Sequence, residues 1–193
     1  QSLYQSRDGY IWIGTFHGGL NRFDPRTDTI TRYLHDPQSE NSLGNNVVRA
    51  IQEDRYGQIW LGTENGLDRY DPSKQTFVHY RYERDKPNSL GNNWVRCLLE
   101  DREGNLWVGT DGGGLHRFDR STDSFTVYRL HPKETTVLPA DQIYAIHEDQ
   151  EGNVWIGTNG AGPIRRDRRT GEFHPLASLV QTPSWMSTAR VYA

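Results

Sequence analysis

The feature that most constrains the fold of this chain is a segment that recurs four times. Each copy contains glycine, any residue, an apolar residue, tryptophan, an apolar residue, glycine and threonine, as in GQIWLGT from residue 57 and GNLWVGT from residue 104. The four tryptophans lie 48, 47 and 48 residues apart, at Trp12, Trp60, Trp107 and Trp155. Self-similarity at a fixed period of this size indicates a repeat architecture, so one supersecondary unit is used four times.

Each unit is predicted to form four short strands and no helix of useful length. In the second repeat the strands are expected at 47–53, around Trp60, at 66–71 and at 76–82. The first two strands are joined by a tight turn that starts with Asp54 and ends with Gly57. Aspartate bonds the backbone of such a turn, and glycine tolerates the positive φ that the turn requires.

The second strand identifies the architecture. Ile59, Trp60 and Leu61 are apolar on both faces of the strand, so neither face meets water. Repeated four-stranded antiparallel units that are buried on both sides are typical of propeller blades. The sequence therefore predicts an all-β fold, a β-propeller in a single domain over 1–193, with blades at about 1–40, 41–87, 88–135 and 136–193.

The amino-acid composition limits the kinds of partner that this chain is expected to bind. With 22 basic and 25 acidic residues the formal net charge is −3, which argues against a protein that binds nucleic acid through bulk charge. No apolar run approaches the roughly 18 residues of a membrane helix, so no membrane contact by this segment is expected. Cys97 is the only cysteine, which excludes a disulfide framework and a cysteine-rich zinc site. We predict no cofactor and no metal.

Strand parity separates two faces of the predicted propeller. The bends between second and third strands must emerge on the same side as the connections between repeats. These connections are long and variable, at 35–46, 83–93, 131–141 and 179–189. We call this side the loop face, and the side with the Asp-x-x-Gly turns the turn face. Binding residues are expected on the loop face.

Residues that recur in register are interpreted as structural. The Glu53/Asp54 pair recurs at 100/101 and 148/149, at a turn, and is not taken as catalytic. The arginines at 22, 69, 117 and 165 recur as well and suggest stacking or pairing within the blades. Cys97 shares its column with Ala50 and Ala145 and is interpreted as a small packing residue. No catalytic residue is predicted.

Positions at which the repeats differ are the candidates for binding. Trp94 stands where the other repeats carry Val47 and Gln142, and could stack on a sugar ring or an aromatic ligand. Arg49, Arg96 and Tyr144 share one column that would suit a carboxylate or a glycan. The predicted ligand-binding set is Trp94, Asn45, Asn46, Arg49, Asn92, Asn93, Arg96, Tyr144, His17, Asn65, Asp111 and Asn159.

The repeat resembles the two-component regulator propeller repeat, whose pattern is roughly Asp-x-x-Gly-x-Leu-Trp-Ile-Gly-Thr-x-x-Gly-Leu. Leu-Gly-Asn-Asn at 43–46 and 90–93 fits the stretch before each first strand. The resemblance implies a periplasmic sensor domain, usually of seven blades, outside a histidine kinase or another signalling enzyme that often responds to glycans. It supplies no motif that assigns binding residues. One departure is Pro163, which replaces a leucine and predicts an irregular or bulged third strand in the last repeat.

Three functional hypotheses follow. The first is a non-enzymatic sensing module that binds a small molecule or an oligosaccharide on the loop face. The second is a propeller lyase or hydrolase, which would use a non-repeated group such as His17, Asp111 or Asp141. The third is a protein-interaction scaffold. Four repeats could be a fragment of a larger propeller, a closed ring, or half of an eight-bladed dimer, so other blades or a second copy of the chain are expected partners.

Overall fold

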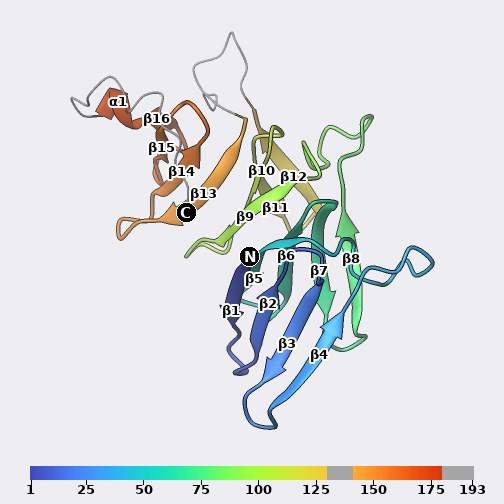
Figure 1. Cartoon of the computed structure of the whole chain (residues 1–193). Helices are drawn as coiled ribbons and strands as arrows, with labels where there is room; N and C mark the ends of the chain where they lie inside the picture. Colours follow the sequence, from blue (N-terminus) through green and yellow to red (C-terminus); the bar gives the residue numbers. More distant parts are fainter. Residues whose placement is uncertain (130–140, 180–193) are drawn as a thin grey trace.

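The computed structural model describes residues 1–129 and 141–179 and consists of four four-stranded antiparallel sheets (Figure 1). The strands are β1 (Ser2–Gln5), β2 (Ile11–Gly14), β3 (Leu20–Asp24) and β4 (Thr29–Tyr33) in blade 1; β5 (Val48–Glu53), β6 (Ile59–Thr63), β7 (Gly66–Asp71) and β8 (Thr76–Tyr80) in blade 2; β9 (Val95–Glu100), β10 (Leu106–Thr110), β11 (Leu115–Asp119) and β12 (Ser124–Tyr128) in blade 3; and β13 (Ile143–Glu148), β14 (Val154–Thr158), β15 (Pro163–Arg166) and β16 (Phe173–Pro175) in blade 4. A four-residue helix, α1 (Leu176–Leu179), follows β16. The all-β prediction is confirmed.

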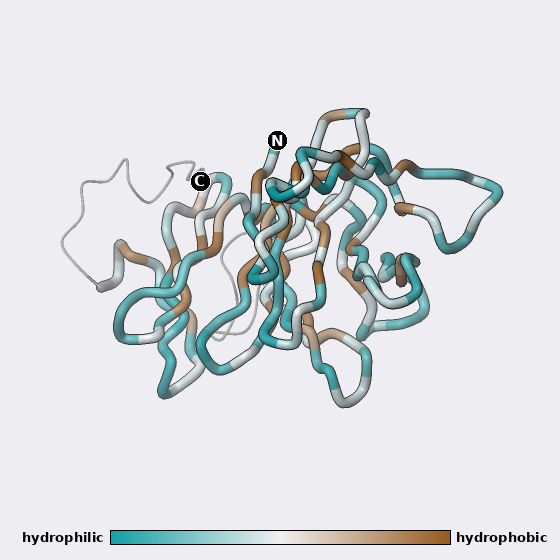
Figure 2. Tube along the Cα trace, turned by 90° about the horizontal axis from the view of Figure 1, so that it is seen from below, coloured by the Kyte–Doolittle hydropathy of each residue, from teal (hydrophilic) through white to brown (hydrophobic). Residues whose placement is uncertain are grey.

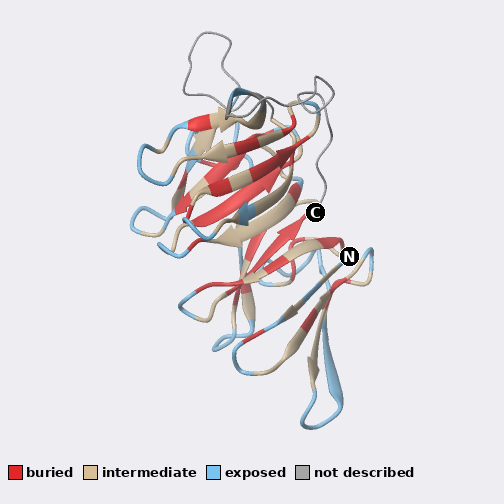
Figure 3. Cartoon of the chain, turned by 90° about the vertical axis from the view of Figure 1, so that its left-hand side faces the viewer, coloured by how far each residue is buried: buried red, intermediate tan, exposed pale blue. Residues whose placement is uncertain are grey.

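The blades follow one another as an arc, and the first strand of each blade is its inner strand. Each sheet keeps the chain order of its strands. β5 packs against β1 and β9, and β9 packs against β13, so neighbouring blades meet through their inner strands. Figure 3 shows buried segments concentrated in these stacked sheets, and β4 exposed at the outer edge of blade 1. Hydrophobic residues follow the strands, and hydrophilic ones gather in the loops (Figure 2).

The repeated tryptophans join each blade to the next. Trp12 lies 5.5 Å from Tyr70 of blade 2, and Trp60 lies 4.9 Å from Phe118 of blade 3, centroid to centroid. In blade 4 the partner of Trp107 is Arg166, whose guanidinium lies 5.0 Å from the indole ring. A cation–π contact thus replaces the tryptophan's aromatic contact with the next blade, although Tyr128 and Phe173 still meet at this junction, at 5.2 Å.

The glycine two residues after each tryptophan permits this close stacking of the blades. A Cβ on Gly62 would lie 2.8 Å from a methyl group of Val95 in blade 3 and 3.2 Å from the Cβ of Ala50. Gly62 and Ala50 are cross-strand partners, as Gly109 and Cys97 are in the next blade. The small side chains of this column therefore let the inner strands of successive blades approach.

The recurring acidic residues hold the turn face together, which confirms their structural interpretation. Asp54 accepts the Trp60 indole N–H at 2.8 Å and the Gln58 backbone N–H at 3.0 Å. Glu53 accepts two hydrogen bonds from Arg7 of the preceding blade, at 2.8 Å from the backbone and 3.0 Å from Nε. The equivalent arginine–glutamate contact recurs between Arg55 and Glu100. It recurs again between Arg102 and Glu148, where the backbone N–H of Arg102 donates.

Two local expectations need revision. Pro163 begins β15, and β15 pairs with β14 in unbroken register from Gly157↔Pro163 to Val154↔Arg166. The predicted irregularity is therefore wrong, because the first position of a strand tolerates a missing N–H. The fourth strand of blade 2 ends at Tyr80 and not at residue 82. Most of the connections 131–141 and 179–189 lies outside the described residues.

Candidate functional site

The loop face carries a feature that recurs in three inner strands, a β-bulge. In β5, Val48 pairs with Thr63 but Ala50 pairs with Gly62, so Arg49 is an extra residue without a cross-strand partner. Equivalent register shifts leave Arg96 as the extra residue in β9 and Tyr144 in β13. A bulge redirects the side chain of its extra residue and is often found beside binding sites. The bulges thus single out the three residues of the column predicted from the sequence.

Both bulged arginines are paired with an acid of their own blade. Arg49 donates from Nε, at 3.1 Å, and from Nη2 to the same oxygen of Glu64. Arg96 donates from Nη2 to Asp111. The side chains of these pairs are 13–26 % exposed, so the pairs are partly withdrawn from solvent.

Trp94 lies between these two pairs. Its side chain is partly open, with 42 % of the residue exposed, and its ring lies 5.7 Å from the guanidinium carbon of Arg49 and 5.9 Å from that of Arg96. Arg96 also stacks on Tyr144, at 4.4 Å from the ring centroid. We define the loop-face cluster as the connected set Arg49, Glu64, Trp94, Arg96, Asp111 and Tyr144.

A hydrogen-bonded chain extends the cluster into blade 4. The Gln142 side chain donates from Nε2 to Oδ1 of Asp111 at 2.9 Å, and its Oε1 accepts from Asn159. Asp111 is therefore held on both oxygens, by Arg96 and by Gln142. Asn159, a predicted site residue, joins the cluster through this chain.

Four of the six predicted asparagines support the cluster by ordering the connections. The side-chain oxygens of Asn46 and Asn93 accept the backbone N–H groups of His35 and Tyr82, at 2.8 and 2.7 Å. Those of Asn45 and Asn92 accept the N–H two residues ahead, of Val47 and Trp94, at 2.7 and 2.8 Å. Trp94 is thereby fixed at the entrance to β9.

Two predicted residues lie apart from the cluster. Asn65 donates from Nδ2 to the Gly44 carbonyl at 3.2 Å and lines a separate hollow of about 560 Å³, together with His35 and His79. His17 has a φ of +69° on the bend of blade 1, and its ring packs on Phe16 at 4.2 Å. Within residues 1–129 and 141–179, the hydrogen bonds and ring contacts of Asn65 and His17 do not involve Trp94, Arg49 or Arg96.

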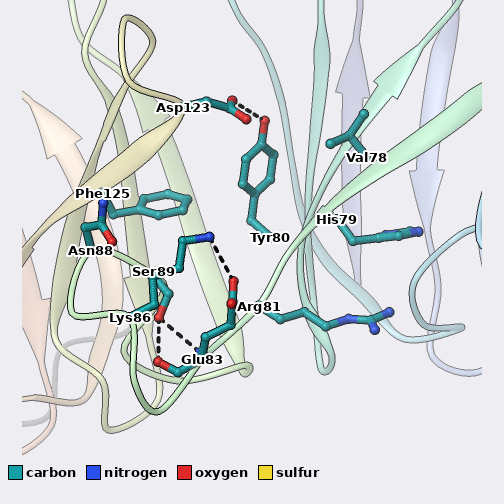
Figure 4. A pocket seen from close by; sticks show the side chains of 10 residues that line it. All are labelled: Val78, His79, Tyr80, Arg81, Glu83, Lys86, Asn88, Ser89, Asp123 and Phe125. Atoms are coloured by element: carbon teal, nitrogen blue, oxygen red, sulfur yellow. Dashed lines mark hydrogen bonds and ion pairs between the residues drawn. The ribbon is translucent and has the colours of Figure 1, made fainter.

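A smaller hollow, of about 150 Å³, lies between blades 2 and 3 (Figure 4). The groups around it bind one another: Tyr80 donates its hydroxyl to Asp123 at 2.8 Å, and Lys86 pairs with Glu83 at 3.1 Å. Ser89 accepts the Glu83 backbone N–H at 3.0 Å. These contacts stabilise the connection between the blades.

Sequence reasoning missed Glu64 and Gln142. Glu64 is the main omission, because it neutralises Arg49 and was not distinguished from the other bend residues. A signal for it exists in the spacing: Arg49 and Glu64 are separated by 15 residues, as are Arg96 and Asp111, and Tyr144 and Asn159. Each bulged residue thus has a counterpart on the bend of its own blade.

Other candidate chemistries find little support in the described parts of the chain. Cys97 is packed beside Ile143, and burial raises the pKa of its thiol to about 12, which opposes formation of a thiolate. Among residues 1–129 and 141–179, no three His, Cys, Asp or Glu side chains cluster closely enough to hold a metal ion. Over the same ranges, the structure contains no helix long and apolar enough to span a membrane.

Comparison with known proteins identifies the repeats. Residues 1–17, 42–65, 89–112 and 137–160 match the family model for the two-component regulator propeller. The repeats of this chain belong to that family. Each two-component regulator propeller repeat thus corresponds to one blade of the structure. Each match includes the second strand of the blade, with its tryptophan.

Several solved structures superpose on most of this chain. The extracellular domains of two putative hybrid two-component systems from B. thetaiotaomicron share 26 % and 28 % identity, cover 90 % and 94 % of this chain, and give TM-scores of 0.74 and 0.76. Virginiamycin B lyase from Staphylococcus aureus, at 18 % identity, 89 % coverage of this chain and 53 % of its own, and a TM-score of 0.64, shares the fold.

A curated relative is Histidine kinase P4 from Formosa agariphila, which is 34 % identical over 61 residues. That match covers 32 % of this chain and 4 % of the kinase. Likewise, the chain spans 23 % and 25 % of the two extracellular domains. The chain therefore corresponds to a small part of these relatives.

Proposed function

We propose that this chain is a non-enzymatic sensing module in the extracytoplasmic part of a two-component signalling protein, and that it binds a small ligand on its loop face. The similarity to extracellular domains of two-component systems supports an extracytoplasmic location and a sensor role. Within that location we propose the periplasm. The signalling reaction would belong to another part of the protein.

The observation that carries the binding proposal is the exposed Trp94 beside the bulged residues Arg49, Arg96 and Tyr144. An open aromatic ring next to oriented polar groups is the composition of a small-molecule site, in which the ring supplies contact area and the polar groups supply orientation. The bulges place these groups on the inner strands, so the site lies on rigid elements. We propose an oligosaccharide as the ligand.

The test is a binding screen of the 193-residue chain against arrayed oligosaccharides, followed by titration of any hit. Trp94→Ala should weaken binding at least about tenfold, the loss expected when a central aromatic contact is removed. Tyr56→Ala is the matched control, because Tyr56 is an exposed aromatic residue on the turn face. Its substitution should leave the affinity unchanged.

Other outcomes would contradict the proposal in different ways. Equal loss of affinity in Trp94→Ala and Tyr56→Ala would remove the loop face as the site. Conversion of the bound sugar into a product would favour the enzyme hypothesis. Capture of a protein partner, with no oligosaccharide bound, would favour an interaction scaffold.

A further inference from the structure

We propose that Glu64 and Asp111 determine the charge of the ligand, and that they make the loop-face cluster selective for an uncharged molecule over a carboxylate- or sulfate-bearing one. The inference rests on the proposed binding function of this cluster. It differs from the expectation drawn from the arginine column alone, because two arginines in one column would suit an anion.

The contacts of the two arginines carry the inference. Two donors of Arg49 converge on one oxygen of Glu64, and Arg96 donates to Asp111. Gln142 holds the second oxygen of Asp111 at 2.9 Å. The two cations and two carboxylates of the cluster therefore balance, and each pair is formed between a bulge and a bend of a single blade.

An anionic ligand would have to compete with these carboxylates. The side chains of Glu64 and Asp111 are only 20 % and 13 % exposed, so neither acid can rotate freely into solvent after losing its arginine. Displacing it would leave a partly buried charge without a partner, which is costly. If the acid stayed in place, two anions would share one guanidinium and repel each other. The acids thus act against anionic ligands.

The remaining surface suits an uncharged ligand with an apolar face and hydroxyl groups. The Trp94 ring offers the apolar face, and its backbone is held by Asn92 at 2.8 Å. The paired arginines and acids around it offer oriented donors and acceptors that need not change partners. A neutral sugar ring has this combination of an apolar face and a hydroxylated rim.

The first test uses inorganic sulfate as the probe and requires no knowledge of the natural ligand. Sodium sulfate is titrated by calorimetry into the wild-type chain and into Glu64→Gln, Asp111→Asn and the double variant, at constant ionic strength. We expect no saturable binding to the wild type, and at least about a tenfold gain in sulfate affinity in the double variant, whose arginines are unmasked. The single variants provide the same test should the double variant fold poorly.

The control is Glu103→Gln. Glu103 accepts the Nε hydrogen of Arg168 at 2.8 Å in an exposed ion pair on the turn face, so this substitution also removes one carboxylate from an arginine. It should bring no gain in sulfate binding. A folded double variant without a gain, or wild-type protein that binds sulfate through Arg49 or Arg96, would overturn the charge inference.

The second test separates this inference from the proposed function. Uncharged and sulfated oligosaccharides are screened side by side against the wild type and Trp94→Ala. Binding of uncharged members only, lost in Trp94→Ala, supports both proposals. Trp94-dependent binding of sulfated members keeps the sensing module and overturns the charge inference. If neither class binds, the proposed function fails, while the sulfate titration still decides whether the acids mask the arginines.

Discussion

The buried ring of His116 accepts the backbone N–H of Gly91 at 2.6 Å, through Nε2. The same task is performed one blade earlier by Asp68, whose carboxylate accepts the N–H of Gly44 at 2.7 Å. Each bond anchors the Leu-Gly-Asn-Asn stretch that leads into the next inner strand. Two different side chains therefore serve one structural need. His116 at one junction and His79, which contacts Asp68 at the other, respond to pH in opposite senses.

At the junction held by His116, stability should fall as the pH is lowered. Burial lowers the pKa of His116 to about 4, from 6.5. Below pH 6.5 the His116 ring is therefore protonated in the unfolded chain but stays neutral in the folded one. The free energy of unfolding declines until the pH reaches about 4. The effect is on the order of 3 kcal/mol. Urea unfolding of wild type and His116→Gln between pH 7.5 and 4 measures it.

The His116→Gln variant should show a flatter pH profile over that window, because it lacks the titrating ring. A wild-type profile as flat as that of the variant would contradict the assignment of Nε2 as a hydrogen-bond acceptor. Asp119→Asn, an exposed change at the last residue of β11, serves as the control and should retain the slope between pH 6.5 and 4.

His79 should behave in the opposite sense. Its Nδ1 lies 2.7 Å from Asp68 and its Nε2 lies 3.0 Å from the Glu40 carbonyl, and the hydrogen bond to Asp68 raises its pKa above 6.5. Its contribution to stability is thus complete below pH 6.5 and is lost as the pH rises through the folded pKa. An NMR titration of the ring measures this pKa.

Asp68→Asn should lower the pKa of His79 toward its ordinary value, because the largest cause of the shift is removed. Asp71→Asn changes a partly exposed carboxylate at the end of β7 in the same blade and should leave the His79 titration in place. Equal shifts in the two variants would show that general charge, and not the Asp68 contact, raises the pKa.

Two tryptophan substitutions should show which tryptophan packs between blades and which belongs to the proposed binding site. Trp107 is fully buried, and Trp107→Ala should lower the free energy of unfolding by about 3–5 kcal/mol. Trp94 is 42 % exposed, and Trp94→Ala should cost less than about 1 kcal/mol. Denaturant unfolding compares them. A large loss in Trp94→Ala would assign Trp94 to packing and weaken the binding proposal.

Asp54, the turn aspartate of blade 2, should contribute more to the stability of the chain than its place in a turn motif suggests. Asp54 accepts the Trp60 indole N–H and also pairs with Arg120 of blade 3 at 2.9 Å. Asp54→Asn should therefore destabilise the chain by about 1–3 kcal/mol, the range for a buried group left with a poor partner. Asp71→Asn, at an exposed turn, should change the thermal midpoint little. Similar losses for the two would argue against the buried network.

The sequence by itself determined the repeat, the four-stranded unit, the division into two faces and the column of Arg49, Arg96 and Tyr144. These features are local or periodic: tryptophans, turn aspartates and glycines recur in register, and the strand period of two decides which face they reach. Even the structural role of Glu53 followed from its repetition alone.

Only the tertiary structure decided what the variable residues do. Arg49 lies in β5 and Glu64 lies in the bend between β6 and β7. Their pairing depends on a bulge that no local pattern marks. Asn65 and His17 share the face of Trp94, but Asn65 bonds to Gly44 and the His17 ring packs on Phe16. The face of the propeller that a residue reaches follows from its place along the strand. Whether two side chains on that face touch depends on bulges and bends, and these form only when the whole sheet pairs.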